Sequence, residues 1–141
     1  MSLVTRRRLW FLAICAGSLA AMDARAQTSM HVTPVETALL PRFCWAQLEV
    51  PNATGDEFRI RDCGPAANHY CGGLINIMRA KRATNKSTRL GLINLADADV
   101  RYTEKAIADY PKCSIRVDVA STRAEVNSLM AMYGLKRPKA Q

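Results

Sequence analysis

The chain has 141 residues, of which 49% are hydrophobic and 23% are charged, with 20 Lys and Arg against 12 Asp and Glu. This length suits one modest domain with a single hydrophobic core rather than two domains. The balance of apolar and charged residues excludes an intrinsically disordered, collagen-like or multi-span membrane protein.

The N-terminus has the features of an export signal. Arginines at 6–8 form a basic region, residues 9–21 are apolar, and Ala24 and Ala26 provide the small residues that a signal peptidase requires. The apolar run is shorter than the ~20 residues of a transmembrane helix. We predict a signal peptide over 1–26 with cleavage after Ala26, and a periplasmic or secreted mature protein without a transmembrane segment. The arginine cluster leaves open whether export is general or twin-arginine.

Signal removal would leave 16 basic and 11 acidic residues, a mild excess of positive charge. The basic residues are scattered except in the tail over 136–141, and no aromatic residues alternate with them as nucleic-acid stacking would require. We therefore expect no nucleic-acid partner. The charge is typical of a solvated surface with weak attraction for anionic lipids or acidic proteins.

Cysteine usage supports the same compartment. Loss of Cys15 with the signal leaves Cys44, Cys63, Cys71 and Cys113, an even number in a short exported domain. This pattern predicts two disulfides, for which three pairings are possible.

Apolar residues of the mature chain recur at helical rather than strand spacing, which predicts an all-α fold of about four helices. We expect residues 27–34 to form a flexible terminus and 35–135 to form the helical domain. The expected helices cover 35–50, with a poorly defined boundary at Pro41; 65 to about 82; 88–110, ended by Pro111; and about 118–133, followed by Gly134. The third helix has two adjacent apolar stripes, which predicts packing on two sides.

An arrangement of consecutive antiparallel helical hairpins selects one disulfide pairing. Residues equidistant from the centre of a hairpin face each other, which pairs Cys44 with Cys71 across the first hairpin. The same argument pairs Cys63 with Cys113 across the second. In the chain-entropy model each bond would stabilise the fold by roughly 3.5–4 kcal/mol.

Few residues of the sequence suggest catalysis or metal binding. Zinc prefers four Cys and His ligands, which Cys44, Cys63, His69 and Cys71 could supply. A metal site is therefore the alternative interpretation of the cysteines. The lack of a C-x2-C pair in an exported domain favours disulfides instead. His31 lies in the expected flexible terminus, and we expect His69 to cap or pack. With no G-x-S-x-G motif, no paired carboxylates with a His partner and no glycine-rich phosphate loop, we expect no catalytic residue, no cofactor and no metal.

Two features of the expected helices require partners. Gly72 and Gly73 lie inside the second helix, where each glycine costs about 1 kcal/mol relative to alanine. They predict a close approach by another helix. Asp99 is a carboxylate within an apolar stripe, and we expect it to bind an Arg or Tyr side chain.

The segments Leu40–Cys44 (L-P-R-F-C) and His69–Leu74 (H-Y-C-G-G-L) carry a family resemblance. They resemble a group of bacterial exported proteins with tetratricopeptide-like repeats, in which an L-P-x-[YF]-C segment and a His-Tyr-Cys motif precede a helical repeat. Ala106 and Pro111 have the spacing of the Ala and Pro that end the second helix of such a repeat. The resemblance covers roughly residues 38–134 in patches, and the usual Trp/Leu/Gly/Tyr signature is incomplete in every window. Two disulfides would substitute for the further repeats that such arrays normally need.

The resemblance implies an interaction module with a groove for protein or peptide segments. We expect a periplasmic protein-binding adaptor or assembly subunit without catalytic activity, whose partner is a protein or peptide. The alternative is a periplasmic inhibitor or immunity-type protein that blocks a toxin or hydrolase, which would share the signal, the size and the two disulfides. The sequence leaves the binding residues and the oligomeric state open.

Overall fold

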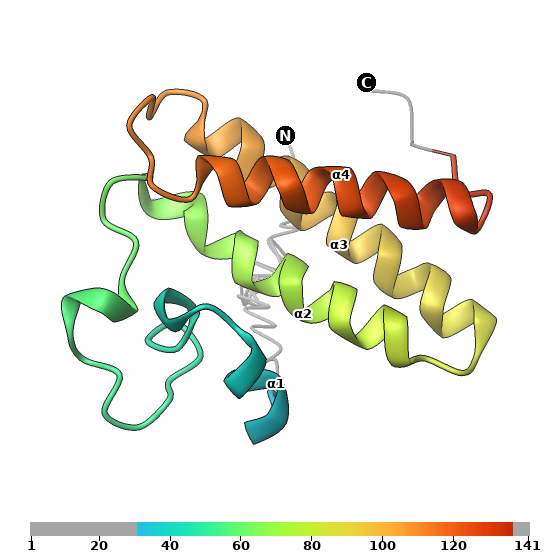
Figure 1. The fold of residues 1–141 in the computed structure, drawn as a ribbon, viewed down its shortest axis with the longest axis horizontal. Helices are drawn as coiled ribbons and strands as arrows, with labels where there is room; N and C mark the ends of the chain where they lie inside the picture. Colours follow the sequence, from blue (N-terminus) through green and yellow to red (C-terminus); the bar gives the residue numbers. More distant parts are fainter. Residues whose placement is uncertain (1–30, 137–141) are drawn as a thin grey trace, which may run out of the picture.

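Three long helices build the centre of the protein in the computed structural model, which describes residues 31–136. They are α2 (His69–Arg82), α3 (Lys86–Ile107) and α4 (Arg116–Met132), and the chain reverses direction from each one to the next (Figure 1). The short helix α1 (Pro34–Leu39) and the 3-10 turns η1 (Arg42–Cys44) and η2 (Asp56–Phe58) lie beside α2, and a third turn, η3 (Pro65–Asn68), leads into it. The described residues contain no strand, so the all-α prediction is confirmed.

The predicted signal peptide over 1–26, its cleavage site after Ala26 and the tail beyond residue 136 lie outside the described residues. Within residues 31–136, no helix is both long and apolar enough to cross a membrane.

The predicted first helix over 35–50 is wrong in its extent. The backbone leaves the helix at Leu40, which has φ −86° and ψ 149°. Pro41 explains this, because the ring of a proline disfavours helical geometry in the residue before it. Glu49 and Asn52 have φ of 55° and 66°, values that a right-handed helix does not contain. The segment therefore folds as a short helix followed by turns.

Helix α1 begins with a capping box. The Thr33 side chain accepts a hydrogen bond from the Glu36 backbone N–H (3.2 Å), and the Glu36 carboxylate accepts one from the Thr33 N–H (2.9 Å). Pro34 occupies the first helical position, where no donor is needed. The prediction placed Thr33 and Pro34 in a flexible terminus over 27–34. In the structure Pro34 belongs to α1, and the His31 carbonyl accepts a hydrogen bond from Arg79 (2.6 Å), while residues 27–30 lie outside the described range.

Helices α2 and α3 approach each other closely at Gly73. A Cβ atom at this position would lie 3.2 Å from Cγ2 of Val100 and 3.3 Å from Cβ of Asp99. The close approach predicted from the glycine pair is therefore present at Gly73. It allows Val100, which is completely buried, to pack directly on the backbone of α2.

One broad face of α3 supplies the core between α2 and α4. Ile93, Ala96 and Val100 on α3 are almost fully buried with Val126 on α4. The neighbouring stripe is covered in part: Leu92 packs against this core and Asp99 lies against α2, whereas Leu95 and Tyr102 are 56% and 50% exposed. The predicted packing of this helix on two sides is therefore confirmed, because α3 packs against both α2 and α4.

A buried ionic network joins α3 to α4. Asp97 is 2% exposed and accepts a hydrogen bond from Arg123 Nη1 (2.5 Å). Arg123 Nε also donates to Glu104 (3.0 Å), and Arg101 pairs with Asp97 one turn along α3 (3.1 Å). The charges therefore compensate one another where α4 crosses α3, as buried carboxylates require.

Two disulfides fix the ends of the helices. Cys63–Cys113 joins the segment before η3 to the loop after α3, and Cys44–Cys71 joins η1 to α2. These are the pairs obtained from the hairpin argument, although Cys44 lies in a 3-10 turn rather than in a partner helix. The four sulfur atoms are thus bonded in two pairs, and these cysteines form disulfides rather than the alternative zinc site.

Gly73 on α2 and Gly91 on α3 provide a test of this packing, because only Gly73 faces another helix closely. Gly73→Val should lower the free energy of unfolding by about 1–3 kcal/mol, because its methyl groups would overlap Val100 and Asp99. Gly91→Ala should raise it by up to about 1 kcal/mol, since no atom lies within 4 Å of the added Cβ and alanine favours the helix. Urea unfolding with the disulfides intact measures both. Equal effects of the two substitutions would contradict the close approach at Gly73.

Candidate functional site

Residues 31–62, which we call the N-terminal layer, cover one side of α2 without forming a long helix. A separate small core lies beneath this layer. Its buried members are Leu40, Cys44, Cys71 and Ile75, of which the last three are completely inaccessible. The disulfide between Cys44 and Cys71 thus runs through the centre of the contact and fixes the layer to α2.

A buried ion pair fixes the same layer at its outer end. Glu36 is 4% exposed, and its two carboxylate oxygens accept hydrogen bonds from Arg79 Nε (2.8 Å) and Nη2 (3.0 Å). The hydrogen bonds from Arg79 are the main reason that the pKa of Glu36 falls from 4.5 to about 2; burial opposes this shift, and the Thr33 donors reinforce it. Helix α1 is therefore held in one orientation despite its six residues.

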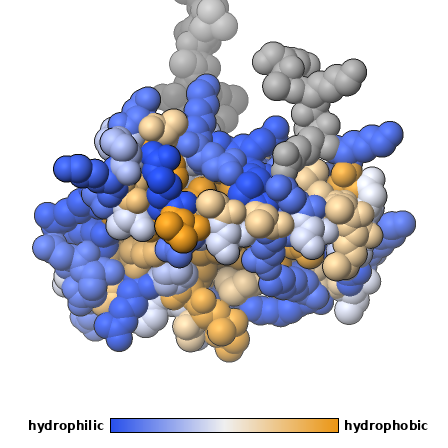
Figure 2. Space-filling view, turned by 45° about the horizontal axis from the view of Figure 1, so that its top comes forward, coloured by the Kyte–Doolittle hydropathy of each residue, from blue (hydrophilic) through white to orange (hydrophobic). Residues whose placement is uncertain are grey.

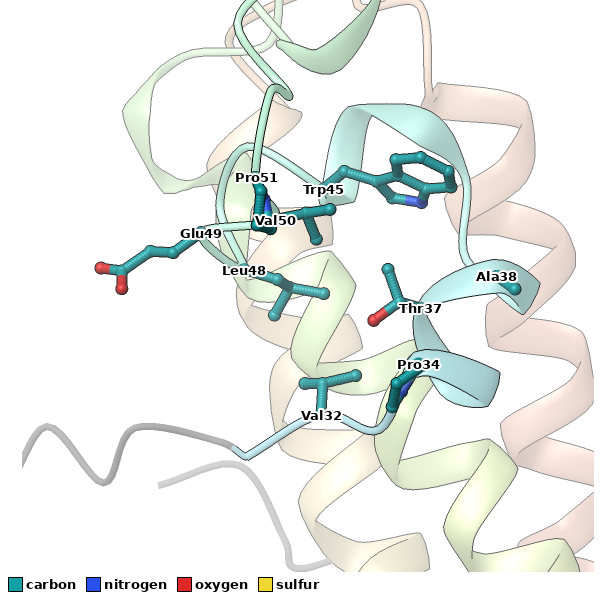
Figure 3. A pocket seen from close by; sticks show the side chains of 9 residues that line it. All are labelled: Val32, Pro34, Thr37, Ala38, Trp45, Leu48, Glu49, Val50 and Pro51. Carbon is teal, nitrogen blue, oxygen red and sulfur yellow. The ribbon is translucent and has the colours of Figure 1, made fainter.

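An apolar cleft opens between α1 and the turns that follow it, and Figure 3 shows the two walls. The cleft encloses about 420 Å³ and is lined by Val32, Pro34, Thr37, Ala38, Trp45, Leu48, Glu49, Val50 and Pro51. Glu49, an exposed residue, is the one charged member of this lining. Volume and composition are those of a site that accepts apolar side chains.

The wall of the apolar cleft at Trp45 is fixed from two sides. The indole stacks on Phe58, with 5.8 Å between ring centroids and an interplanar angle of 26°. Its Nε1 donates a hydrogen bond to the carbonyl of Leu40 (3.4 Å). The indole therefore presents an apolar surface to the cleft, with its single donor already satisfied.

Two aliphatic side chains project from α1 into solvent. Val35 and Leu39 are each 64% exposed, and we call them the α1 ridge. Leu39 borders another hollow of about 360 Å³, whose apolar residues include Phe43 and Leu74. Figure 2 shows how apolar residues are exposed in small groups among charged ones on one face of the molecule. The ridge thus lies on a helix that the Glu36–Arg79 ion pair holds in place.

Of the residues whose side chains could take part in acid–base chemistry or metal binding, the structure brings His69 and Asp99 together. His69 Nδ1 lies 3.4 Å from Asp99 Oδ1, and Asn76 Nδ2 donates to Asp99 Oδ2 (3.2 Å). The predicted Arg or Tyr partner of Asp99 is therefore wrong, because the approach at Gly73 brings α2 rather than an arginine against this carboxylate. The His69 ring packs on Tyr102, with 4.2 Å between centroids.

The His69–Asp99 pair has the geometry of an acid–base pair but no visible reaction partner. Among residues 31–136, no hydroxyl or thiol is hydrogen-bonded to His69. No group of three or more His, Cys, Asp and Glu side chains in this range is placed to hold a metal ion. Nucleophilic catalysis needs such a hydroxyl or thiol within hydrogen-bond reach of the base. Residues 31–136 place no such group beside the His69 ring.

Comparison with known proteins adds no assignment: no family model, no curated protein and no solved structure matches the chain. The resemblance to exported tetratricopeptide-like proteins stays a prediction.

The residues that build this layer were mostly missed by sequence reasoning. The pattern Thr33-Pro34-Val35-Glu36 is a capping-box signal and identifies the start of α1. Arg79 carries no comparable signal, because its partner Glu36 lies 43 residues away. Trp45 belongs to the expected helix over 35–50, where periodicity could not place it in a cleft.

The ion pair predicts a specific pH dependence. The lowered pKa of Glu36 stabilises the fold fully above its unfolded value of 4.5, and this contribution is lost as the pH falls towards 2. Glu36→Gln should therefore cost about 2–3 kcal/mol at pH 7, and the difference from wild type should shrink between pH 4.5 and 2. Urea unfolding at a series of pH values measures this difference. Glu57→Gln, at an exposed carboxylate, is the control and should differ little from wild type at any pH.

Proposed function

We propose that the protein is an exported binding module without catalytic activity, an adaptor or assembly subunit that holds an apolar segment of another protein. The observation that carries this proposal is the α1 ridge, two largely exposed aliphatic side chains on the same short helix that lines the apolar cleft through Pro34, Thr37 and Ala38. The partner segment would cover Val35 and Leu39 and insert side chains beside Trp45.

The energetics of the N-terminal layer support this role. Burying one Val or Leu side chain contributes about 1.5–3 kcal/mol, a gain that the described fold leaves unused at both ridge positions. The Glu36–Arg79 ion pair and the Cys44–Cys71 disulfide order the layer before any partner arrives. Binding to a preorganised surface avoids much of the entropy cost of ordering loops.

Two disulfides are consistent with an exported protein. We propose that residues 1–26 act as the signal peptide and that α2, α3 and α4 correspond to one and a half tetratricopeptide-like repeats. The reversals of chain direction between these helices, and the tight contact at Gly73, support the repeat proposal.

The test is affinity capture from a native periplasmic extract with three forms of the mature protein. Wild type and the control Val117→Asp/Met132→Asp should retain the same binding protein, since these control residues are also exposed (78% and 68%) but lie on α4. Val35→Asp/Leu39→Asp should lose at least nine-tenths of it, because two carboxylates would be buried in the interface. Quantitative mass spectrometry measures the retained amount.

The purified partner then gives the decisive measurement. Its Kd should rise at least tenfold for the ridge variant and stay within about twofold of wild type for the control. The proposal would be overturned if no captured protein depended on the α1 ridge, or if all three forms retained equal amounts. A partner that is a toxin or hydrolase inhibited by the complex would identify the protein as an inhibitor or immunity-type protein instead of an adaptor.

A further inference from the structure

A second cleft lies on the N-terminal layer, on the other side of the Trp45–Phe58 stack, and we call it the basic cleft. It encloses about 470 Å³ between η1 and the segment that leads into α2. Its lining is formed by Phe43, Ala46, Gln47, Phe58, Arg59, Ile60, Arg61, Gly64, Pro65 and Asn68. Phe58 is stacked on Trp45, so that this pair of rings separates the basic cleft from the apolar cleft.

The charge of the basic cleft is of one sign. Two arginines line it and no acidic residue does. Arg59 is exposed and makes no ion pair within the described residues. Arg61 donates to Asp56 (2.7 Å), but the two side chains are 65% and 82% exposed, and such pairs contribute little and exchange readily. Within the described residues Arg59 is therefore unpaired, and an incoming anion would have to displace Asp56 to pair with Arg61.

Part of the lining of the basic cleft is apolar, which restricts the kind of anion. Phe43, Phe58 and Ile60 are partly buried and lie among the lining residues. A small hydrated anion would leave this surface uncovered, whereas a chain with both carboxylates and apolar side chains would satisfy both parts of the cleft. Arginine also forms bidentate hydrogen bonds with carboxylates in a planar geometry.

We propose that the basic cleft binds the acidic side chains of the same partner segment whose apolar side chains occupy the apolar cleft. This inference rests on the proposed function and specifies its partner: a protein segment in which Asp or Glu lies close to aliphatic or aromatic residues. The shared Trp45–Phe58 stack brings the two clefts within reach of one short segment. Charge complementarity sets its direction on the layer, with the acidic part towards Arg59 and Arg61.

The test is selection of binding peptides from a random library displayed on phage, with the disulfide-bonded mature protein as target. Wild type should select peptides enriched both in Asp or Glu and in apolar residues. Arg59→Glu/Arg61→Glu should still select apolar residues but lose the acidic ones. The control Arg82→Glu/Lys86→Glu changes the net charge equally at exposed positions where α2 ends and α3 begins, and should select like wild type.

Binding of one selected peptide, followed by fluorescence anisotropy, gives the magnitude. The Kd should rise at least tenfold for Arg59→Glu/Arg61→Glu, stay within about twofold for the control, and rise with salt concentration for wild type. Far-UV circular dichroism and the urea midpoint of each variant verify that the fold is intact.

The outcomes separate this inference from the proposed function. If wild type selects apolar residues without acidic ones, the proposal that the basic cleft binds acidic side chains is overturned, and the proposed function is unaffected. No enrichment of any kind would overturn both. Flotation with phosphatidylglycerol vesicles that depends on Arg59 and Arg61, without selection of acidic peptides, would assign these arginines to a lipid surface and overturn the inference.

Discussion

The attachment of the N-terminal layer to α2 is the constraint on which the candidate site depends. The layer has one six-residue helix and three-residue turns, too little regular structure to be stable alone. A covalent bond between Cys44 and Cys71 and a doubly hydrogen-bonded ion pair between Glu36 and Arg79 supply what its own backbone cannot. With both attachments in place, the layer can expose apolar side chains such as Val35 and Leu39 without folding over them.

The helical core and the N-terminal layer differ in how far they bury their apolar side chains. The core buries branched aliphatic side chains such as Ile93, Val100 and Val126 between three helices, and its single buried carboxylate group is neutralised by arginines from two helices. The layer buries little and exposes Val35 and Leu39. A rigid scaffold that carries a less regular surface is a common basis for recognition, because the scaffold bears the stability and the surface is free to serve binding.

The sequence predicted the three long helices well because their signals are local. Helical spacing of apolar residues, the proline at the start of η3 and the glycine after α4 all act within a few residues. The N-terminal layer could not be predicted in this way. Periodicity alone ran the first helix past Pro41, and left-handed geometry at Glu49 is set by the surrounding turns rather than by the residue type. Likewise, periodicity could not predict that Leu95 and Tyr102 are exposed, or that Arg79 forms an ion pair with Glu36.

The Cys63–Cys113 bond has a mechanical consequence. It closes residues 63–113 into a covalent ring, and the Cys44–Cys71 bond attaches the N-terminal layer to that ring. Tension applied between the layer and α4 would pass through both sulfur bridges and the short stretch between Cys63 and Cys71. The remainder of α2 and all of α3 would carry no load, so a pulling partner could not unravel them.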